Sequence, residues 1–304
     1  MFAKEKFIFK DSTFRVLQLT DLHIDAKNPN QDSYFNKLLT IIKASRPQLL
    51  FFTGDIVTGQ ENTLDGWKQL LAFLEETQIP YTMVLGNHDP EVAKKNEIYE
   101  LLKRGKYAQY NYIEAYKEQP LCYVIPIYDK KRIVWNLWGF DSGSMSTDKR
   151  IKGYAWVSQK TIFDINDMYQ QLHPNEQDHL DDLAFQHIPV PEYSIATKRK
   201  YRDFHIVGHC KEKVCSPQIN SGLFYCLWKK HFKGIFVGHD HNNDYVSQLY
   251  GLPLIYGRCS GDKTCYGKLR MGARVIELHK DRTYKTWVID DQLKRSEIIQ
   301  LPKN

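Results

Sequence analysis

Three short apolar runs alternate with amphipathic segments in the first third of this chain. The runs are of strand length and cover residues 14–19, 49–52 and 81–85. Between them, residues 33–44 and 64–77 carry apolar side chains at helical spacing, and Pro90 occupies a favoured first position for a third helix. This β-α-β-α-β-α order predicts a parallel sheet covered by helices, which binds ligands at the carboxyl ends of its strands.

The rest of the chain has a pattern dominated by strands. Only two helices are expected there, at residues 162–171 and 221–230. Further strands are expected at residues 123–127, 133–140, 183–187, 235–237, 245–249, 254–256, 273–278 and 284–289. The sequence has no internal repeat, low-complexity tract or Gly/Ser-rich linker. We therefore expect a second sheet packed on the first within one domain, residues 1–304.

Polar residues follow five of the expected strands. They are Asp21, His23, Asp55, Asn87, His88, Asp89, His187, His239 and His241. Some have ordinary alternatives: Asp55 could be a turn residue, Asn87 a helix cap, and His187 a hydrogen-bonded core histidine. His239 and His241 are separated by one residue, so in an extended segment both side chains point to the same side. Their occurrence at all five strand ends favours a shared site.

The chemical types of these side chains are those of a metal site. Carboxylate, amide and imidazole groups supply oxygen and nitrogen ligands without sulfur, a set that suits Zn, Fe, Mn or Co. The residues are too many for one ion. Two ions about 3.5–4 Å apart, bridged by one carboxylate, would use them fully. The sequence therefore predicts a dinuclear metal centre at the edge of the sheet.

The overall composition is that of a folded soluble protein. The 42 basic and 36 acidic residues leave a net charge of +6 without long basic clusters, so nucleic acid is not an expected partner. No apolar run reaches the roughly 18 residues that a membrane-spanning helix needs. The charged start of the chain lacks the apolar core of a secretory signal, which favours the cytoplasm; secretion is the alternative if a signal was removed.

The six cysteines include no Cys-x-x-Cys pair, so a zinc ribbon or a thioredoxin-type site has no support. Cys210 with Cys215, and Cys259 with Cys265, are close enough in sequence to be bridged in an oxidising compartment. Free thiols are the preferred interpretation.

The strand-end residues resemble, in order and spacing, the signature of the calcineurin-like metallophosphoesterase superfamily. The signature has five blocks: Asp21-x-His23, Gly54-Asp55, Gly86-Asn87-His88-Asp89, His187 and Gly238-His239-x-His241. Stretches at residues 185–193, 220–224, 238–244, 256–258 and 272–276 resemble its purple-acid-phosphatase-related branch. Within it, the chain is similar to the single-domain yeast and plant proteins called probable inactive purple acid phosphatases. We therefore expect a four-layer α/β/β/α sandwich of two mixed sheets flanked by helices, the metallophosphoesterase fold.

Carried over position by position, the resemblance implies a centre of two divalent transition-metal ions, Mn, Zn or Fe. The first ion would be held by Asp21, His23 and His241. The second would be held by Asn87, His187 and His239, with Asp55 bridging the two ions. A hydroxide between the ions would attack the phosphorus of a phosphate ester.

The resemblance also implies residues that act on the substrate. His88 resembles the family's catalytic histidine, which would protonate the leaving alkoxide or stabilise the phosphoryl oxygens, and Asn87 is a weaker candidate for substrate contact. Asp89 would orient the His88 imidazole; the alternative is to cap the helix after Pro90. Arg258 is a candidate for contact with the substrate phosphate, and a surface salt bridge is its alternative.

Residues outside the motif are expected to have structural roles or to be solvated. Asn242 and Asp244 could tie down the loop that carries His239 and His241. His209 is interpreted as a loop residue. The remaining histidines are expected to be structural or solvated; they are His173, His179, His205, His231 and His279.

The chain departs from the true purple acid phosphatases at one position. Their second motif continues as Gly-Asp-x-x-Tyr, where the tyrosine binds ferric iron, whereas this chain has Thr58 there. The absence of this tyrosine therefore favours Mn, Zn or Fe(II) at the site over ferric iron. No expected ligand is missing, so the word "inactive" fits this sequence poorly.

The function expected from these residues is hydrolysis of a phosphate ester by a metallophosphatase. A phosphomonoester, on a small molecule or a phosphoprotein, is the expected substrate, and the enzyme is expected to be a monomer. One alternative is a phosphodiesterase or nuclease that uses the same site. Another is a metal-binding scaffold protein without turnover. Substrate specificity is expected to depend on the loops at residues 143–157 and 195–217, whose conformations the sequence does not define.

Overall fold

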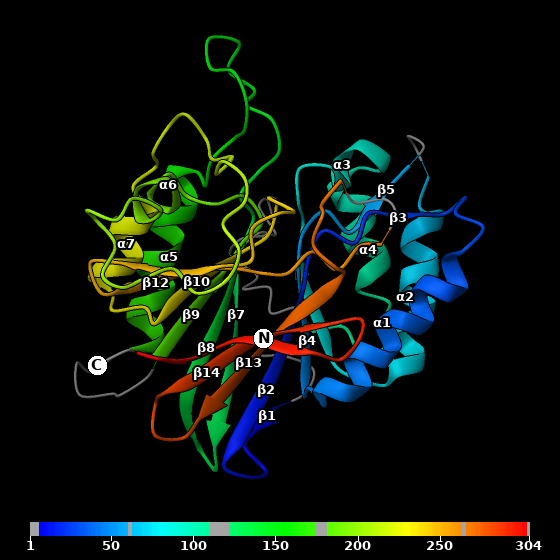
Figure 1. The fold of residues 1–304 in the computed structure, drawn as a ribbon, viewed down its shortest axis with the longest axis horizontal. Helices are drawn as coiled ribbons and strands as arrows, with labels where there is room; N and C mark the ends of the chain where they lie inside the picture. Colours follow the sequence, from blue (N-terminus) through cyan, green and yellow to red (C-terminus); the bar gives the residue numbers. More distant parts are fainter. Residues whose placement is uncertain (1–5, 60–62, 110–121, 174–180, 263–265, 303–304) are drawn as a thin grey trace.

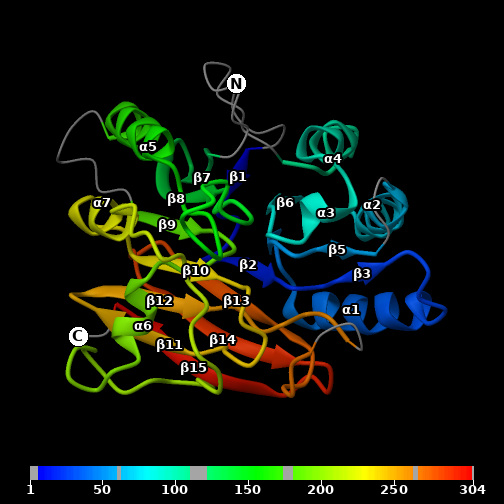
Figure 2. The same ribbon diagram turned by 90° about the horizontal axis from the view of Figure 1, so that it is seen from above.

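The apolar runs found in the sequence form the strands of two sheets. The computed structural model describes residues 6–59, 63–109, 122–173, 181–262 and 266–302 of the chain. In it, a six-stranded and a seven-stranded sheet lie face to face, and helices cover the outer face of each sheet (Figures 1 and 2). The predicted four-layer α/β/β/α sandwich is confirmed.

The six-stranded sheet has the first three predicted strands at one end. These are the parallel strands β2 (Thr13–Leu19), β4 (Leu49–Thr53) and β6 (Tyr81–Val84). On the other side of β2 the sheet continues with the antiparallel strands β13 (Gly272–His279), β14 (Tyr284–Asp290) and β15 (Arg295–Leu301). Its outer face is covered by α1 (Gln31–Ser45) and α2 (Asp65–Thr77), with α3 (Asp89–Val92) and α4 (Lys95–Leu102) after β6.

The seven-stranded sheet has the order β1-β7-β8-β9-β10-β12-β11. Its strands are β1 (Phe7–Ile8), β7 (Cys122–Asp129), β8 (Arg132–Phe140), β9 (Asp181–Phe185), β10 (Gly234–Val237), β11 (Val246–Leu249) and β12 (Leu252–Tyr256). Its outer face is covered by α5 (Gln159–Leu172), α6 (Glu192–Ala196) and α7 (Leu223–Lys229). A small two-stranded sheet, β3 (Ile24–Asp25) with β5 (Val57–Thr58), lies beside the first sheet.

The central strands are buried on both faces, which explains their continuous apolar sequences. Every residue of β4, Leu-Leu-Phe-Phe-Thr, is buried, and the same holds for β10. Strands covered on one face by helices and on the other by a second sheet cannot alternate apolar and polar residues without burying polar groups. The uninterrupted runs in the sequence therefore indicated the inner position of these strands.

Aromatic stacking joins the two sheets directly behind the strand ends. The rings of Phe51 in β4 and Phe185 in β9 stack with centroids 4.1 Å apart, and Phe185 stacks in turn on Phe236 in β10 at 5.0 Å. All three side chains are fully buried. Because Phe51 and Phe185 belong to different sheets, their contact fixes the position of one sheet relative to the other.

Several elements differ from the sequence expectation, among them the short strands β1, β3 and β5, which were not expected. β15 was not expected, because only Ile299 and Leu301 of this edge strand are buried and its other side chains, apart from the exposed Ile298, are charged or polar. The helix expected at Pro90 is two short helices, since Ala93 is extended, with φ −158° and ψ 158°, between α3 and α4. The short α6 was also not expected.

In the part of the chain that the structure describes, no helix has the length and apolar character needed to cross a membrane.

We predict that Phe51→Ala lowers the free energy of unfolding by about 3–5 kcal/mol, because it leaves a cavity between the sheets that neither sheet can close. Phe163→Ala, which truncates a phenylalanine of α5 that is 65% exposed, is the matched control and should change the free energy by less than about 0.5 kcal/mol. Urea unfolding of both variants measures the difference. Equal effects would show that the stack does not hold the sheets together.

Candidate metal centre

The carboxyl ends of five strands meet at one edge of the sandwich. β2, β4 and β6 end here in the first sheet, and β9 and β10 end here in the second. Backbone hydrogen bonds join the segments that follow them: Asp21 N–H donates to the Gly54 carbonyl (3.0 Å), and Gly238 N–H donates to the His187 carbonyl (3.1 Å). Parallel strands thus bring residues from five distant parts of the sequence to one place.

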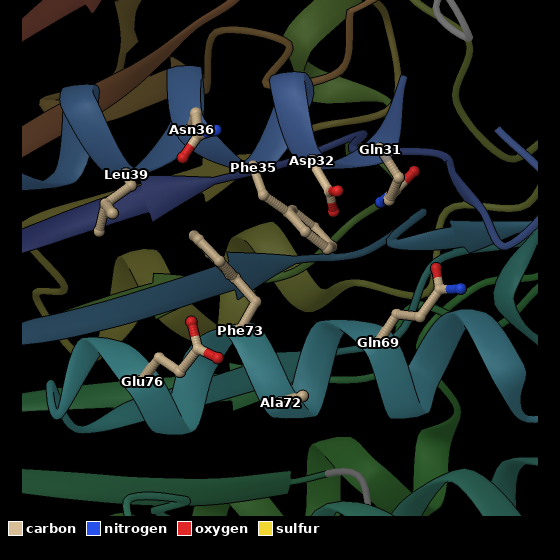
Figure 3. A pocket seen from close by; sticks show the side chains of 9 residues that line it. All are labelled: Gln31, Asp32, Phe35, Asn36, Leu39, Gln69, Ala72, Phe73 and Glu76. Atoms are coloured by element: carbon tan, nitrogen blue, oxygen red, sulfur yellow. The ribbon is translucent and has the colours of Figure 1, made fainter. Parts of the chain in front are cut away.

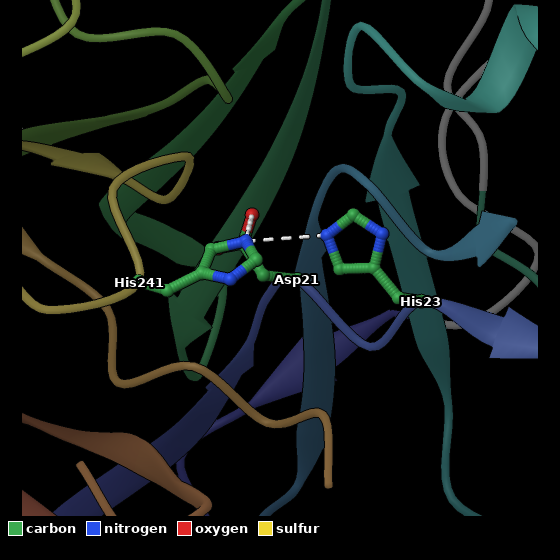
Figure 4. A group of neighbouring side chains, drawn as sticks. All are labelled: Asp21, His23 and His241. Carbon is green, nitrogen blue, oxygen red and sulfur yellow. Dashed lines mark hydrogen bonds and ion pairs between the residues drawn. The ribbon is translucent and has the colours of Figure 1, made fainter. Parts of the chain in front are cut away.

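The first group of converging side chains is Asp21, His23 and His241. Their donor atoms all lie within 4.8 Å of one another. Nε2 of His23 is 3.2 Å from Nε2 of His241, which is 3.5 Å from Oδ1 of Asp21. Figure 4 shows the two imidazoles directed at each other, with the carboxylate beside the His241 ring. This is the set predicted to hold the first ion.

The second group is Asp55, His187 and His239, whose donor atoms also lie within 4.8 Å of one another. Nε2 of His187 is 3.0 Å from Oδ2 of Asp55 and 3.3 Å from Nδ1 of His239. Nδ1 of His187 donates to the Thr53 carbonyl at 2.7 Å, which directs Nε2 into the group. The structure therefore brings together the histidines predicted for the second ion and the predicted bridging carboxylate.

Two buried polar atoms at this edge fit metal coordination. Asn87 is 5% exposed and His239 is 7% exposed. Within the described residues, neither Oδ1 of Asn87 nor Nε2 of His239 has a hydrogen-bond partner. Such atoms are uncommon in folded proteins; the Asn87 oxygen carries lone pairs, and a neutral imidazole such as that of His239 carries a lone pair on one of its two ring nitrogens. Oxygen and imidazole donors without sulfur suit a divalent transition metal, so the residues fit the predicted ions.

The protonation states of the histidines also suit metal binding. Burial lowers the pKa of His239 to about 3, and burial likewise lowers the pKa of His23, so both imidazoles are neutral near pH 7. His187 differs: burial acts to lower its pKa, but the Asp55 carboxylate outweighs burial and raises it to about 9. Burial acts to raise the pKa of Asp55, but His187 holds it well below its usual range. A metal ion that binds His187 must therefore displace a proton.

Strained backbone surrounds the two groups. Asp21, His23, Asp55 and His239 have φ values of 53°, 46°, 49° and 80°, in the left-handed region that side chains other than glycine seldom adopt. Such conformations cost of order 1–3 kcal/mol each and occur mainly at functional sites. Gly86 is needed for a different reason, because a Cβ at this position would overlap the Asp55 carboxylate. The backbone thus adopts strained conformations that direct these side chains to one point.

Asp89 does not have the predicted role. It neither orients His88 nor caps the following helix with its side chain. Its fully buried carboxylate accepts the backbone N–H groups of Ile56 (2.8 Å), Val57 (3.0 Å) and Gly86 (2.7 Å). Sequence adjacency misled the prediction, because consecutive side chains at the start of a helix point in different directions. Asp89 holds the loop after β4 against the loop after β6.

His88 is paired with a residue that the sequence analysis missed. Its Nδ1 lies 2.8 Å from Oε2 of Glu91, and its side chain is 43% exposed at the edge of the first group, with its ring 5.6 Å from that of His23. The His88 N–H donates to Oδ1 of Asp55 at 2.8 Å. The i,i+3 spacing of His88 and Glu91 across a helix start was the available signal.

Arg258 is not placed to contact a substrate. Its guanidinium is buried rather than at the surface; it donates to Asp244 and lies 3.5 Å from Glu297. Arg274, fully buried, also pairs with Glu297 at 3.3 Å. The prediction of a phosphate contact or a surface salt bridge at Arg258 is therefore wrong. The side chain belongs to a buried ion network that connects the histidine loop to β15.

His209 is a loop residue, as predicted, but it joins this network. Its Nδ1 is 3.1 Å from Oδ1 of Asp244 and 3.0 Å from Oε1 of Glu297. The three side chains have the spacing of a metal site, yet the arginines already neutralise both carboxylates. Asp244 also accepts the His209 N–H and Asn242 accepts the Lys268 N–H, so both tie down the loop after β10 as suggested.

Among the remaining predicted histidines, His205 and His231 are exposed, whereas two others have structural surroundings. His173 stacks on Tyr169 at 4.0 Å and lies 3.0 Å from the Asp182 carboxylate. His279 contacts Thr283. His179 and Cys265 lie outside the described residues. Four of the other cysteines are free thiols, Cys122, Cys210, Cys215 and Cys226, and the Cys259 thiol donates a hydrogen bond to the Asp21 carbonyl at 3.4 Å.

A groove elsewhere on the molecule is not lined by the predicted ligands. It lies between α1 and α2 and has a volume of about 580 Å³ (Figure 3). Its floor contains Phe35 and Phe73, which stack with centroids 4.6 Å apart. The metal-ligand groups instead lie at the strand ends, so the groove is not part of the candidate site.

We predict that Asp89→Asn lowers the free energy of unfolding by about 1–3 kcal/mol, because the amide nitrogen cannot accept a hydrogen bond and one buried N–H loses its acceptor. Glu91→Gln is the matched control, since its side chain is 61% exposed, and should change stability by less than about 0.5 kcal/mol. Urea unfolding compares them. Wild-type stability in Asp89→Asn would contradict the role assigned to this carboxylate.

Comparison with known proteins identifies the family. Residues 14–243 match the family model described as calcineurin-like phosphoesterase. The chain is 30% identical to "Probable inactive purple acid phosphatase 29" of Arabidopsis thaliana, over 92% of this chain and 83% of the relative. It is 28% identical to "Phosphatase DCR2" of Saccharomyces cerevisiae, over 83% of this chain but only 48% of that protein.

A solved structure agrees with the fold. The dimetal phosphatase of Danio rerio superimposes with a TM-score of 0.66, at 11% sequence identity, over 96% of this chain and 99% of that one. At this identity the likeness concerns the fold alone. Together with the match over residues 14–243, it confirms the resemblance seen in the motifs. The chain belongs to the calcineurin-like phosphoesterases, and within that family it is similar to the purple acid phosphatases.

Proposed function

We propose that this protein is a dinuclear-metal-dependent phosphomonoesterase. The observation that carries the proposal is the pair of buried donor groups at one edge of the sandwich, Asp21-His23-His241 and Asp55-His187-His239. Membership of a phosphoesterase family supports phosphate-ester chemistry, and one relative is named a phosphatase. Another is named inactive. In this chain each predicted ligand is present, which supports turnover.

We assign the metal ligands as follows. Asp21, His23 and His241 would hold one ion. Asn87, His187 and His239 would hold the other, and Asp55 would bridge them because its carboxylate lies against His187 and interacts electrostatically with His23. When bound, the two ions would lower the pKa of a water molecule near the phosphorus and neutralise charge on the phosphoryl oxygens.

His88 is assigned as the proton donor to the leaving group. Glu91 engages Nδ1, so Nε2 is the nitrogen available to the leaving oxygen. The hydrogen bond with Glu91 also holds the imidazole in one orientation, which an acid catalyst needs in order to reach the leaving oxygen. Asp55 accepts the His88 N–H, so a hydrogen bond ties the backbone of the proton donor directly to the bridging carboxylate. Glu91 is therefore a positioning residue for His88.

The expectations of a single domain, a monomer and a cytoplasmic location stay predictions. The two alternatives to the proposed function are a phosphodiesterase and a metal-binding scaffold protein. A diesterase would hydrolyse the diester analogue of a monoester substrate faster than the monoester. A scaffold would bind metal without turnover.

We predict that metal-free protein reloaded with Mn, Zn or Fe(II) hydrolyses 4-nitrophenyl phosphate faster than bis(4-nitrophenyl) phosphate. Asp55→Asn should abolish measurable turnover, because it removes the charge that would bridge the ions. Absorbance of released nitrophenolate measures both rates. Tyr250→Leu, on an exposed turn away from the donor groups, is a control that should retain wild-type rates.

Either of two results would contradict the proposed function. Faster hydrolysis of the diester would identify a phosphodiesterase. Absence of hydrolysis with each metal, from folded protein with metal bound, would identify a binding protein.

We predict that His88→Ala lowers kcat about 10²–10⁴-fold for an alkyl phosphate and much less for 4-nitrophenyl phosphate, because nitrophenolate leaves without needing a proton. Glu91→Gln should show the same dependence on leaving group with a smaller loss, since the imidazole remains but loses its carboxylate partner. Initial rates with the two substrates measure the effect. Equal losses with both substrates would show that His88 does not protonate the leaving group.

A further inference from the structure

Two tyrosines that belong to no motif lie against the candidate ligands. Tyr154 makes an edge-to-face contact with His239, with ring centroids 4.4 Å apart and planes at 88°. Tyr266 stacks on His241, with centroids 4.0 Å apart and planes at 15°. Each of the two donor groups therefore has one tyrosine packed against one of its histidines.

These tyrosines are not core residues. Tyr266 is 61% exposed, although its inner face is covered by His241, and Tyr154 is half-buried. Tyr81 and Tyr193, by contrast, are fully buried in the sandwich. Tyr266 has one face on the His241 imidazole and the other in solvent, and the exposed part of Tyr154 lies beside His239. Both rings are therefore placed to meet the group attached to a phosphate held at the donor groups.

Tyr266 is held in this orientation by hydrogen bonds. Its hydroxyl accepts the His241 N–H at 3.3 Å and donates to Oε2 of Glu212 at 3.2 Å. The other oxygen of Glu212 accepts the Asn242 N–H at 2.5 Å. The hydroxyl end of the ring is thus held in place before any ligand binds, which reduces the conformational entropy that binding would cost.

We propose that Tyr154 and Tyr266 form aromatic walls that select phosphate monoesters whose alcohol carries an aromatic ring, such as phosphotyrosine side chains. This inference rests on the proposed phosphomonoesterase function. The phosphoryl group would lie at the donor groups, and the ring next to it would pack on the exposed tyrosine surfaces. Tyr154 belongs to residues 143–157, one of the loops in which the sequence analysis expected specificity.

The expected preference is modest and measurable. An aromatic pair gains a few-fold in affinity beyond its buried area, about 2- to 10-fold for each ring. Aliphatic rings of similar size bury similar area but lack this contribution. A comparison of two ligands that differ only in aromaticity therefore isolates the contribution of the tyrosines.

The test compares benzyl phosphate with cyclohexylmethyl phosphate, which have the same charge, similar size and alcohols of similar acidity. The wild-type metal-loaded protein should have a higher kcat/KM for benzyl phosphate. Tyr154→Leu and Tyr266→Leu should each reduce the ratio of the two kcat/KM values about 2- to 10-fold. Tyr154→Phe and Tyr266→Phe, which keep the rings, should retain most of the ratio. Tyr250→Leu, which removes a tyrosine that is 63% exposed elsewhere, should leave it unchanged.

Binding of benzylphosphonate and cyclohexylmethylphosphonate, measured by calorimetry, provides a readout that needs no turnover. If neither phosphate ester is hydrolysed, the proposed function fails, while a preference for benzylphosphonate that the leucine variants lose would still support the aromatic walls. If the leucine variants lose bound metal but keep the wild-type ratio, the tyrosines only support the histidines and the inference is overturned. Equal wild-type affinity for both phosphonates would also overturn it.

Discussion

The buried carboxylate of Asp55 is the contact on which the site depends. One of its oxygens lies 3.0 Å from Nε2 of His187, at the end of the second sheet, and the other accepts the His88 N–H from the loop after β6. It therefore joins segments that follow β4, β6 and β9. Replacing one member of a buried ion pair leaves an uncompensated charge, which costs about 3–5 kcal/mol. The same carboxylate is the one that could bridge two ions, so structure and proposed chemistry depend on one residue.

The core behind the site fixes this contact. Phe51 lies four residues before Asp55 and Phe185 two residues before His187, and the two rings stack between the sheets at 4.1 Å. Asp89 adds three backbone hydrogen bonds that hold the adjoining loops. The strained φ values of Asp21, Asp55 and His239 persist because this packing and hydrogen bonding determine the backbone around them.

Much of the fold and most of the site could be predicted from the sequence. Continuous apolar runs marked the inner strands, and the motif placed seven donors at the strand ends. Side-chain direction was harder to predict: Asp89 adjoins His88 in sequence but bonds to backbone instead, and the charge of Arg258 gave no sign that it is buried with Asp244. β15 was missed because this edge strand buries only Ile299 and Leu301. Tyr154 and Tyr266 belong to no motif, so only the three-dimensional arrangement identifies them.

The most direct test of the central claim is the number of metal ions that each chain binds. Metal-free protein would be dialysed to equilibrium against Mn or Zn, and the bound metal determined by elemental analysis. Because the donors form two adjacent groups, we predict two ions per chain in the wild type and fewer in Asp55→Asn, in which the bridging charge is lost. A single ion per chain, or equal binding by both proteins, would contradict the dinuclear centre.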